Sequence, residues 1–258
     1  MTLFRQFFSA HLKGLLIWLA VGTALSLAMT RSAAPFINNR SMEALPPVLT
    51  AVFGDMTGLS PVDQYIVIAL GKGTMLVPVL HGVLLALSVV TREVDRRTVD
   101  FILSLPVQRT QLLGARVAVL VTNLTLLVAA TWAVLRYDLA SQGFQGSWSH
   151  VGALMINLWL LAVAVSLAAL AVSMWLDDYS VGVKLFLGVI TLAYLLEFVL
   201  KGASVSRAGR VLSPFSYVDS AGVMRTGAIG TDALVLAAVG AAGLIVSFWA
   251  FGRKQFSA

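Results

Sequence analysis

The chain has 258 residues, of which 59% are hydrophobic and 12% charged, and its mean hydropathy is +0.89. Soluble domains average about 45–50% apolar and about 25% charged residues, so this composition excludes an ordinary soluble protein and indicates an integral membrane protein. The net charge of +6 fits membrane topology better than nucleic-acid binding, and the absence of cysteine excludes disulfides, thiolate metal sites and cysteine nucleophiles.

The N-terminal residues 1–13 place Leu3, Phe4, Phe7 and Phe8 at helical spacing among basic residues. This pattern is typical of an amphipathic helix that lies in the membrane interface. It runs directly into an apolar stretch that ends before Arg31. Because the aromatic lead is unlike the short basic start of a signal peptide, we expect this first helix to be retained.

Six apolar runs are long enough to cross a bilayer as helices, which needs about 20 residues each. We therefore predict an all-α integral membrane protein that forms one transmembrane domain over residues 1–258. The expected spans are 14–29, 65–91, 112–135, 151–176, 181–200 and 232–251. In the last of them, Ala233, Ala237 and Ala241 share one helical face and predict close helix packing.

An even number of spans places both termini on the same side of the membrane. The short loop from Arg92 to Arg109 is rich in arginine and is flanked closely by spans, so the positive-inside rule applies to it. We expect this loop and both termini to face the cytoplasm, in a multi-pass protein of the plasma (inner) membrane.

That loop is also the one densely charged segment in a mostly apolar sequence. Its apolar and charged residues fit a short helix at the membrane surface, which Pro106 would end because a proline disfavours helical backbone in the residue before it. An ordinary solvated loop explains the same residues, and physical arguments alone leave both interpretations open.

The segment from Glu93 to Arg109, with the sequence EVDRRTVDFILSLPVQR, resembles the signature of ABC-2 type transporter permeases. The later run Pro214-Phe215-Ser216-Tyr217-Val218-Asp219 resembles a second motif of that family, in the external loop before the last helix. The sequence departs from the family pattern at Arg97, where glycine is usual, and at Asp100, where glutamate is commoner.

The resemblance implies that this loop is a cytoplasmic coupling helix that docks on a separate ATP-binding subunit and transmits its movement. The residues expected to make this contact are Glu93, Asp95, Arg96, Arg97, Thr98, Asp100, Phe101, Leu105, Pro106 and Arg109. It further implies that ATP and Mg are bound by the partner subunit and that a second permease copy or a paralogue completes the transporter.

The chain has no Walker A loop of its own, which would read G-x-x-x-x-G-K-[ST]. The nearest candidate, Gly71-Lys72-Gly73, has Ile66 in place of the first glycine and lies in an apolar stretch. No catalytic motif and no cofactor site is recognised in the sequence, so we expect a transport subunit rather than an enzyme.

Polar side chains within the spans need a reason, because an ionised group at the bilayer centre costs roughly 2.5–3.5 kcal/mol on insertion scales. Glu197 and Lys201 are spaced for an ion pair along one helix. Lys72 fits either a side chain that extends toward the membrane surface or one that faces a wet cavity. We interpret His81, Asn123 and Asn157 first as packing and interhelical hydrogen-bonding groups, with a substrate path as the alternative for all of these polar residues.

Together these features favour the permease subunit of an ATP-driven ABC transporter for an amphipathic or lipid-like solute, and the resemblance implies that this solute is exported. The alternative is a membrane scaffold or sensor that docks an ATPase or another cytoplasmic partner without moving a solute.

Overall fold

The computed structural model describes residues 2–38, 52–89, 108–176, 178–202 and 213–253, and within these ranges every regular element is a helix. Five helical stretches are long and apolar enough to cross a membrane: Leu3–Asn38, Arg109–Ser141, Trp148–Ser173, Tyr179–Lys201 and Asp232–Arg253. The protein is therefore a multi-pass helical membrane protein. The predicted coupling helix in residues 92–107 lies outside the described residues.

The first helix, α1 (Thr2–Arg31), is continuous, and only a short helix, α2 (Ala33–Asn38), follows it. No break separates the predicted interfacial part from the predicted span, so interfacial placement of residues 1–13 stays a prediction.

The second predicted span is built from three consecutive segments instead of one helix. These are α4 (Pro61–Ile68), the π-helical η1 (Ala69–Thr74) and α5 (Leu76–Ser88). Pro78 explains the break, because it lacks the N–H that would bond to the carbonyl of Thr74 and its ring crowds that turn. The separate segments are too short to count as spans on their own, so the count of six rests on reading them as one crossing.

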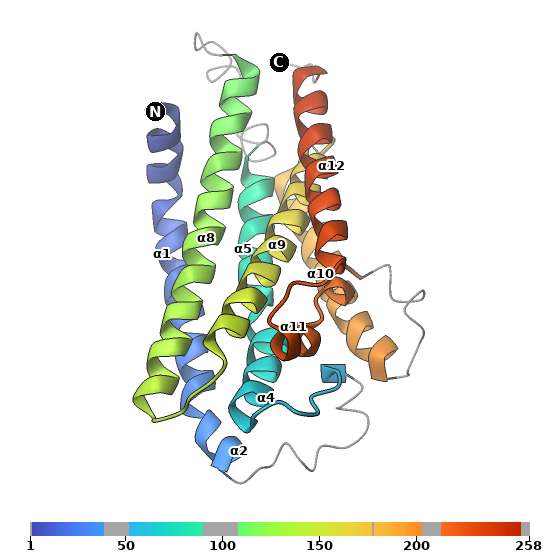
Figure 1. Ribbon diagram of the computed structural model, residues 1–258. Coiled ribbons are helices and arrows are strands. Elements are labelled where there is room, and N and C mark those ends of the chain that lie inside the picture. Colours follow the sequence, from blue (N-terminus) through green and yellow to red (C-terminus); the bar gives the residue numbers. More distant parts are fainter. Residues whose placement is uncertain (1, 39–51, 90–107, 177, 203–212, 254–258) are drawn as a thin grey trace.

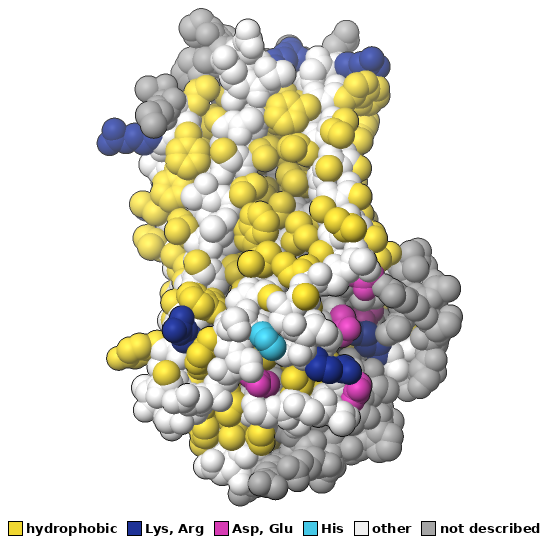
Figure 2. All heavy atoms as spheres, viewed as in Figure 1, with side chains coloured by type: hydrophobic (Ala, Val, Ile, Leu, Met, Phe, Trp, Pro, Cys, Tyr) yellow, Lys and Arg dark blue, Asp and Glu magenta, His cyan; other side chains and the backbone are white. Residues whose placement is uncertain are grey.

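The remaining long helices are α8 (Arg109–Ser141), α9 (Trp148–Ser173), α10 (Tyr179–Gly202) and α12 (Asp232–Arg253). Helix α9 is the centre of the bundle, with α5, α8 and α12 packed on it, while α1 packs on α8 (Figure 1). Large apolar side chains on α1, α10 and α12 stay exposed, as expected for helices that face lipid. Figure 2 shows apolar side chains over the middle of the molecule and charged ones toward its two ends.

The prediction that the last helix packs through its alanine stripe is wrong. Ala237 and Ala241 are exposed, and α12 instead meets α9 through Gly240 and Gly243. A Cβ added to Gly243 would lie 2.8 Å from the backbone carbonyl of Leu167. The two helices therefore approach so closely that only glycine fits at this position.

Both ends of the described chain lie at one end of the molecule, together with the end of α5 and the start of α8 (Figure 1). The opposite end carries α2, α4, the short 3₁₀ helix η3 (Pro214–Tyr217) and α11 (Ser220–Thr226). We call these two ends the terminal end and the capped end.

Two buried carboxylates fasten the capped end. Asp138 of α8 accepts hydrogen bonds from Thr30 Oγ1 (2.5 Å) and Gln142 Nε2 (2.8 Å), and its Oδ1 lies 2.7 Å from Arg31 Nη2. Asp63 of α4 accepts from the backbone N–H of Ser147 at 2.9 Å and from its hydroxyl at 3.0 Å. These contacts tie α1 to α8 and α4 to the start of α9.

The second family motif, residues 214–219, also has a structural role at this end. Phe215 is fully buried, and the centres of its ring and of the nearly perpendicular Tyr194 ring lie 5.4 Å apart. Asp219 caps α11 by accepting a hydrogen bond from the N–H of Gly222 at 3.0 Å. The motif therefore anchors the cap to α10 and begins the next helix.

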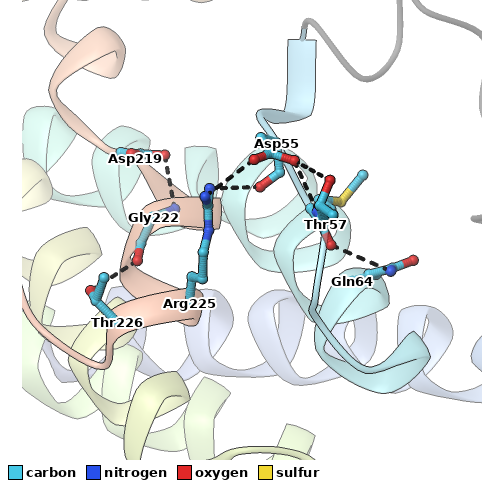
Figure 3. A network of polar contacts seen from close by, with 8 residues as sticks. Asp55, Thr57, Gln64, Asp219, Gly222, Arg225 and Thr226 are labelled. Atoms are coloured by element: carbon cyan, nitrogen blue, oxygen red, sulfur yellow. Dashed lines mark hydrogen bonds and ion pairs between the residues drawn. The ribbon is translucent and has the colours of Figure 1, made fainter.

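An exposed ion pair joins α11 to the loop before α4, with Arg225 Nη1 3.2 Å from Asp55 Oδ2 (Figure 3). Hydrogen bonds from the Thr57 side chain and backbone, assisted by the charge of Arg225, lower the pKa of Asp55 below its ordinary 3.8.

We expect Asp55→Asn to lower the thermal unfolding midpoint slightly at neutral pH, and by progressively less as the pH falls below 3.8. The depressed pKa means that the stabilising effect is present above 3.8 and is lost as the pH falls through the lowered value. Thermal unfolding of both proteins in detergent across this range measures the difference. Thr57→Val is the matched variant, since it removes the largest cause of the shift and should move the pH at which the effect is lost upward. A difference that stays constant with pH would contradict the assignment to this carboxylate.

Candidate functional site

The predicted coupling residues from Glu93 to Pro106 lie outside the described residues, and their contacts stay a prediction. The structure does describe both helix ends that bracket them. Helix α5 ends at Ser88, and α8 begins at Arg109, whose side chain is exposed at the terminal end. The segment therefore connects two helices that both pack on α9.

Arg116 is the residue that the sequence analysis missed at this end. It lies two turns into α8 and is 95% buried, since only 5% of its surface is exposed. Its Nη1 donates to the carbonyl of Val89, the last described residue before the coupling segment. Its guanidinium carbon also lies 4.7 Å from the centre of the Phe7 ring in α1. An arginine within an apolar span was the signal that could have identified it.

The arrangement around Arg116 links three helices at the entry to the coupling segment. The hydrogen bond fixes the end of α5 to α8, and the cation–π contact adds α1. Any displacement of the chain between α5 and α8 would therefore be transmitted to α1, α5 and α8 together.

The polar residues predicted within the spans are all deeply buried where their side chains are described. The exposed fractions are 4% for His81, 1% for Asn123, 2% for Asn157 and 0% for Glu197. Lys72 belongs to η1, and its side chain lies outside the described part of the structure.

Several of these polar atoms have no hydrogen-bond partner among the described residues. They are Nε2 of His81, both amide atoms of Asn123 and Oδ1 of Asn157. The ring of His81 instead packs 5.5 Å from that of Trp18 in α1. The expected interhelical hydrogen bonds of the two asparagines are thus not seen in the described ranges. Since buried polar groups are almost always paired, these atoms need an explanation beyond packing.

Glu197 and Lys201 form the ion pair that their spacing predicts, with Nζ 2.8 Å from Oε1. The carboxylate is fully buried near the capped end of α10, while its Oε2 accepts no hydrogen bond from any described residue. One oxygen of a buried charge is therefore left unsatisfied.

A family model described as ABC-2 family transporter protein matches residues 13–200. This match covers more than half of the chain and includes the whole segment from Glu93 to Arg109. The chain belongs to the ABC-2 transporter family. It is a membrane permease of the kind that works with an ABC ATP-binding partner. The second motif, Pro214 to Asp219, lies beyond the matched range. A comparison with curated proteins found no match to this chain.

Proposed function

We propose that this permease is the membrane subunit of an ATP-driven exporter of an amphipathic or lipid-like solute. The observation that carries the proposal is the family match over residues 13–200, which contains the coupling motif. ATP and Mg are bound and ATP is hydrolysed by a separate subunit, and a second permease copy or a paralogue completes the complex.

The topology of the proposal treats α4, η1 and α5 as one crossing. From Pro61 to Ser88 they would extend about 42 Å at 1.5 Å per residue, more than the roughly 30 Å of a bilayer core. With the five long helices this gives six crossings, which agrees with both ends of the described chain lying at the terminal end (Figure 1). The arginines from Arg92 to Arg109 support a cytoplasmic location for that end.

Coupling begins when the ATP-binding subunit binds residues 92–107 of the permease. Because Arg116 holds the end of α5 and contacts α1, displacement of the segment passes into three helices. Outward-facing and inward-facing states must then differ in their contacts with the partner, since a ligand shifts an equilibrium only by differential binding.

The character of the spans supports an amphipathic solute. Apolar side chains dominate the bundle, and the buried polar atoms without partners on His81, Asn123 and Asn157 lie on α5, α8 and α9, which contact one another. These atoms would gain partners if the helices separate and admit polar groups of the solute or water.

The test is co-purification of the permease with its ATP-binding subunit, read as ATPase bound per permease. We expect Asp100→Arg and Phe101→Ala to lose most of the partner, because they remove one polar and one apolar contact of the coupling segment. Asp178→Asn is the control, since it changes an exposed acidic residue at the same end, which caps α10 through the N–H of Val181. Equal retention of the ATPase by all four proteins would contradict the docking assignment.

Transport is measured separately, with the wild-type complex in vesicles and a fluorescent short-chain phospholipid as the probe. ATP-dependent movement of the probe supports export of a lipid-like solute. A stable complex that hydrolyses ATP without moving any solute favours the scaffold or sensor.

A further inference from the structure

An apolar groove runs between α8 and α9 on the outside of the bundle. Its cavity volume is about 370 Å³, within the size range of small-molecule sites, and it is lined almost entirely by apolar atoms. Among its lining residues are Trp132 of α8 and Met155, Ile156 and Trp159 of α9. Two of the lining residues are joined by a hydrogen bond from Trp159 Nε1 to Thr125 Oγ1, at 3.0 Å.

A positive charge lies beside the groove, toward the capped end. Arg136 lies one turn beyond Trp132 on α8, and its guanidinium carbon is 5.4 Å from the centre of the indole ring. Arg136 is exposed and forms no ion pair with any residue that the structure describes. The indole Nε1 of Trp132 is buried, so it does not take part in binding a ligand in the groove. One exposed cationic donor thus stands beside the mouth of an apolar groove.

Gly152 keeps the groove open from the side of α9. A Cβ added at Gly152 would meet no atom within 4 Å, so packing does not require glycine there. Glycine also disfavours a helix relative to alanine, and this position is inside α9. The missing side chain leaves space that faces the lipid and that a ligand can fill.

We propose that this groove is a binding site for an anionic phospholipid. One acyl chain lies between the two tryptophans, and the phosphate is bound by the exposed guanidinium of Arg136, which packs over the Trp132 ring. Charge complementarity selects this occupant: the walls suit a hydrocarbon chain, and arginine binds phosphate through charge-assisted hydrogen bonds. The site needs only the membrane location of the chain, so it does not depend on the coupling to an ATPase.

Native mass spectrometry of the delipidated permease tests the proposal, with phosphatidylglycerol and phosphatidylcholine of identical acyl chains as probes. We expect the wild type to retain one phosphatidylglycerol and to bind it about tenfold more tightly than phosphatidylcholine, as for one charge-assisted hydrogen-bonded contact. Arg136→Gln should remove this preference. Gly152→Leu should weaken both lipids, because the new side chain occupies the groove without displacing any atom at its Cβ.

The matched control is Arg253→Gln. Arg253 also lies over a tryptophan, 4.4 Å from the ring centre of Trp249, but at the terminal end of α12 and away from the groove. It should bind phosphatidylglycerol as the wild type does. Equal binding of the two lipids by the wild type, or an unchanged preference in Arg136→Gln, would overturn the proposal.

A second copy of the chain is the other possible occupant. The sequence has no cysteine, so Gly152→Cys introduces a single thiol. Disulfide-linked dimers of this variant in vesicles would show that another protomer covers the groove, and would refute the lipid site. A monomeric product is the expected result.

Discussion

Replacing Asp138 by alanine is expected to destabilise the permease by about 2–3 kcal/mol. The carboxylate is only 2% exposed and accepts from Thr30 and Gln142 while it pairs with Arg31. Breaking a buried pair costs about 3–5 kcal/mol in general, but the Arg31 side chain is 69% exposed and can return to water, which lowers the figure.

The thermal unfolding midpoint in detergent measures this effect, with Asp138→Asn as the comparison that keeps an acceptor for Thr30. The asparagine variant should fall between wild type and alanine. A double-mutant cycle with Arg31→Gln isolates the ion pair from the two hydrogen bonds. Unfolding of Asp138→Ala at the wild-type midpoint would show that this contact does not hold α1 to α8.

Gly243→Ala is expected to destabilise the contact between α12 and α9 by about 1–3 kcal/mol through overpacking. The added methyl group would lie 2.8 Å from the backbone carbon and oxygen of Leu167 and 2.9 Å from the nitrogen of Ala168. Backbone atoms in the centre of a bundle cannot rotate away as the end of a side chain can, so α12 must move outward. Close helix approach is a main source of association within membranes, and the loss spreads along the interface.

Gly188→Ala is the matched control, because a Cβ at this position in α10 meets no atom within 4 Å. Alanine favours a helix by up to about 1 kcal/mol over glycine, so the control should be neutral or more stable. The change in the thermal unfolding midpoint of each variant, relative to the wild type, measures this difference: it should be negative for Gly243→Ala and zero or positive for Gly188→Ala. A stabilised Gly243→Ala protein would mean that α12 and α9 are not held in the close contact described.

Hydropathy predicted the order and approximate limits of the long helices because each apolar run must fill the same bilayer thickness. It could not predict how helices face one another. The alanine stripe at 233, 237 and 241 and the glycine face at 240 and 243 are equally good packing surfaces in sequence, and only the position of α9 decides between them. Pro78 was a signal for the break before α5, but the high average hydropathy of this run made it look like one continuous helix.

The buried polar groups were predicted unevenly for a related reason. His81, Asn123, Asn157 and Glu197 stand out because their neighbours in sequence are apolar. Asp63 and Asp138 lie at helix ends beside other polar residues, where a solvated position is the simpler expectation, and only the fold buries them. Arg116 reads in sequence as one more charge near the start of an apolar run, whereas its role depends on the carbonyl of Val89 and the ring of Phe7.

The π-helical segment η1 sets the rotational phase of everything that follows it in α5. A π turn accommodates one residue more than an α turn, and each residue of an α-helix advances about 100° around the axis. Helix α5 is therefore turned by about 100° from the phase that a straight continuation of α4 would give it. His81 faces Trp18, and Gly82 lies against Ser166 and Leu124, only with this offset. The number of residues in η1 is therefore constrained more tightly than the length of the apolar runs around it. A span tolerates an extra residue at its end. One residue fewer in η1 would present a different face of α5 to the bundle.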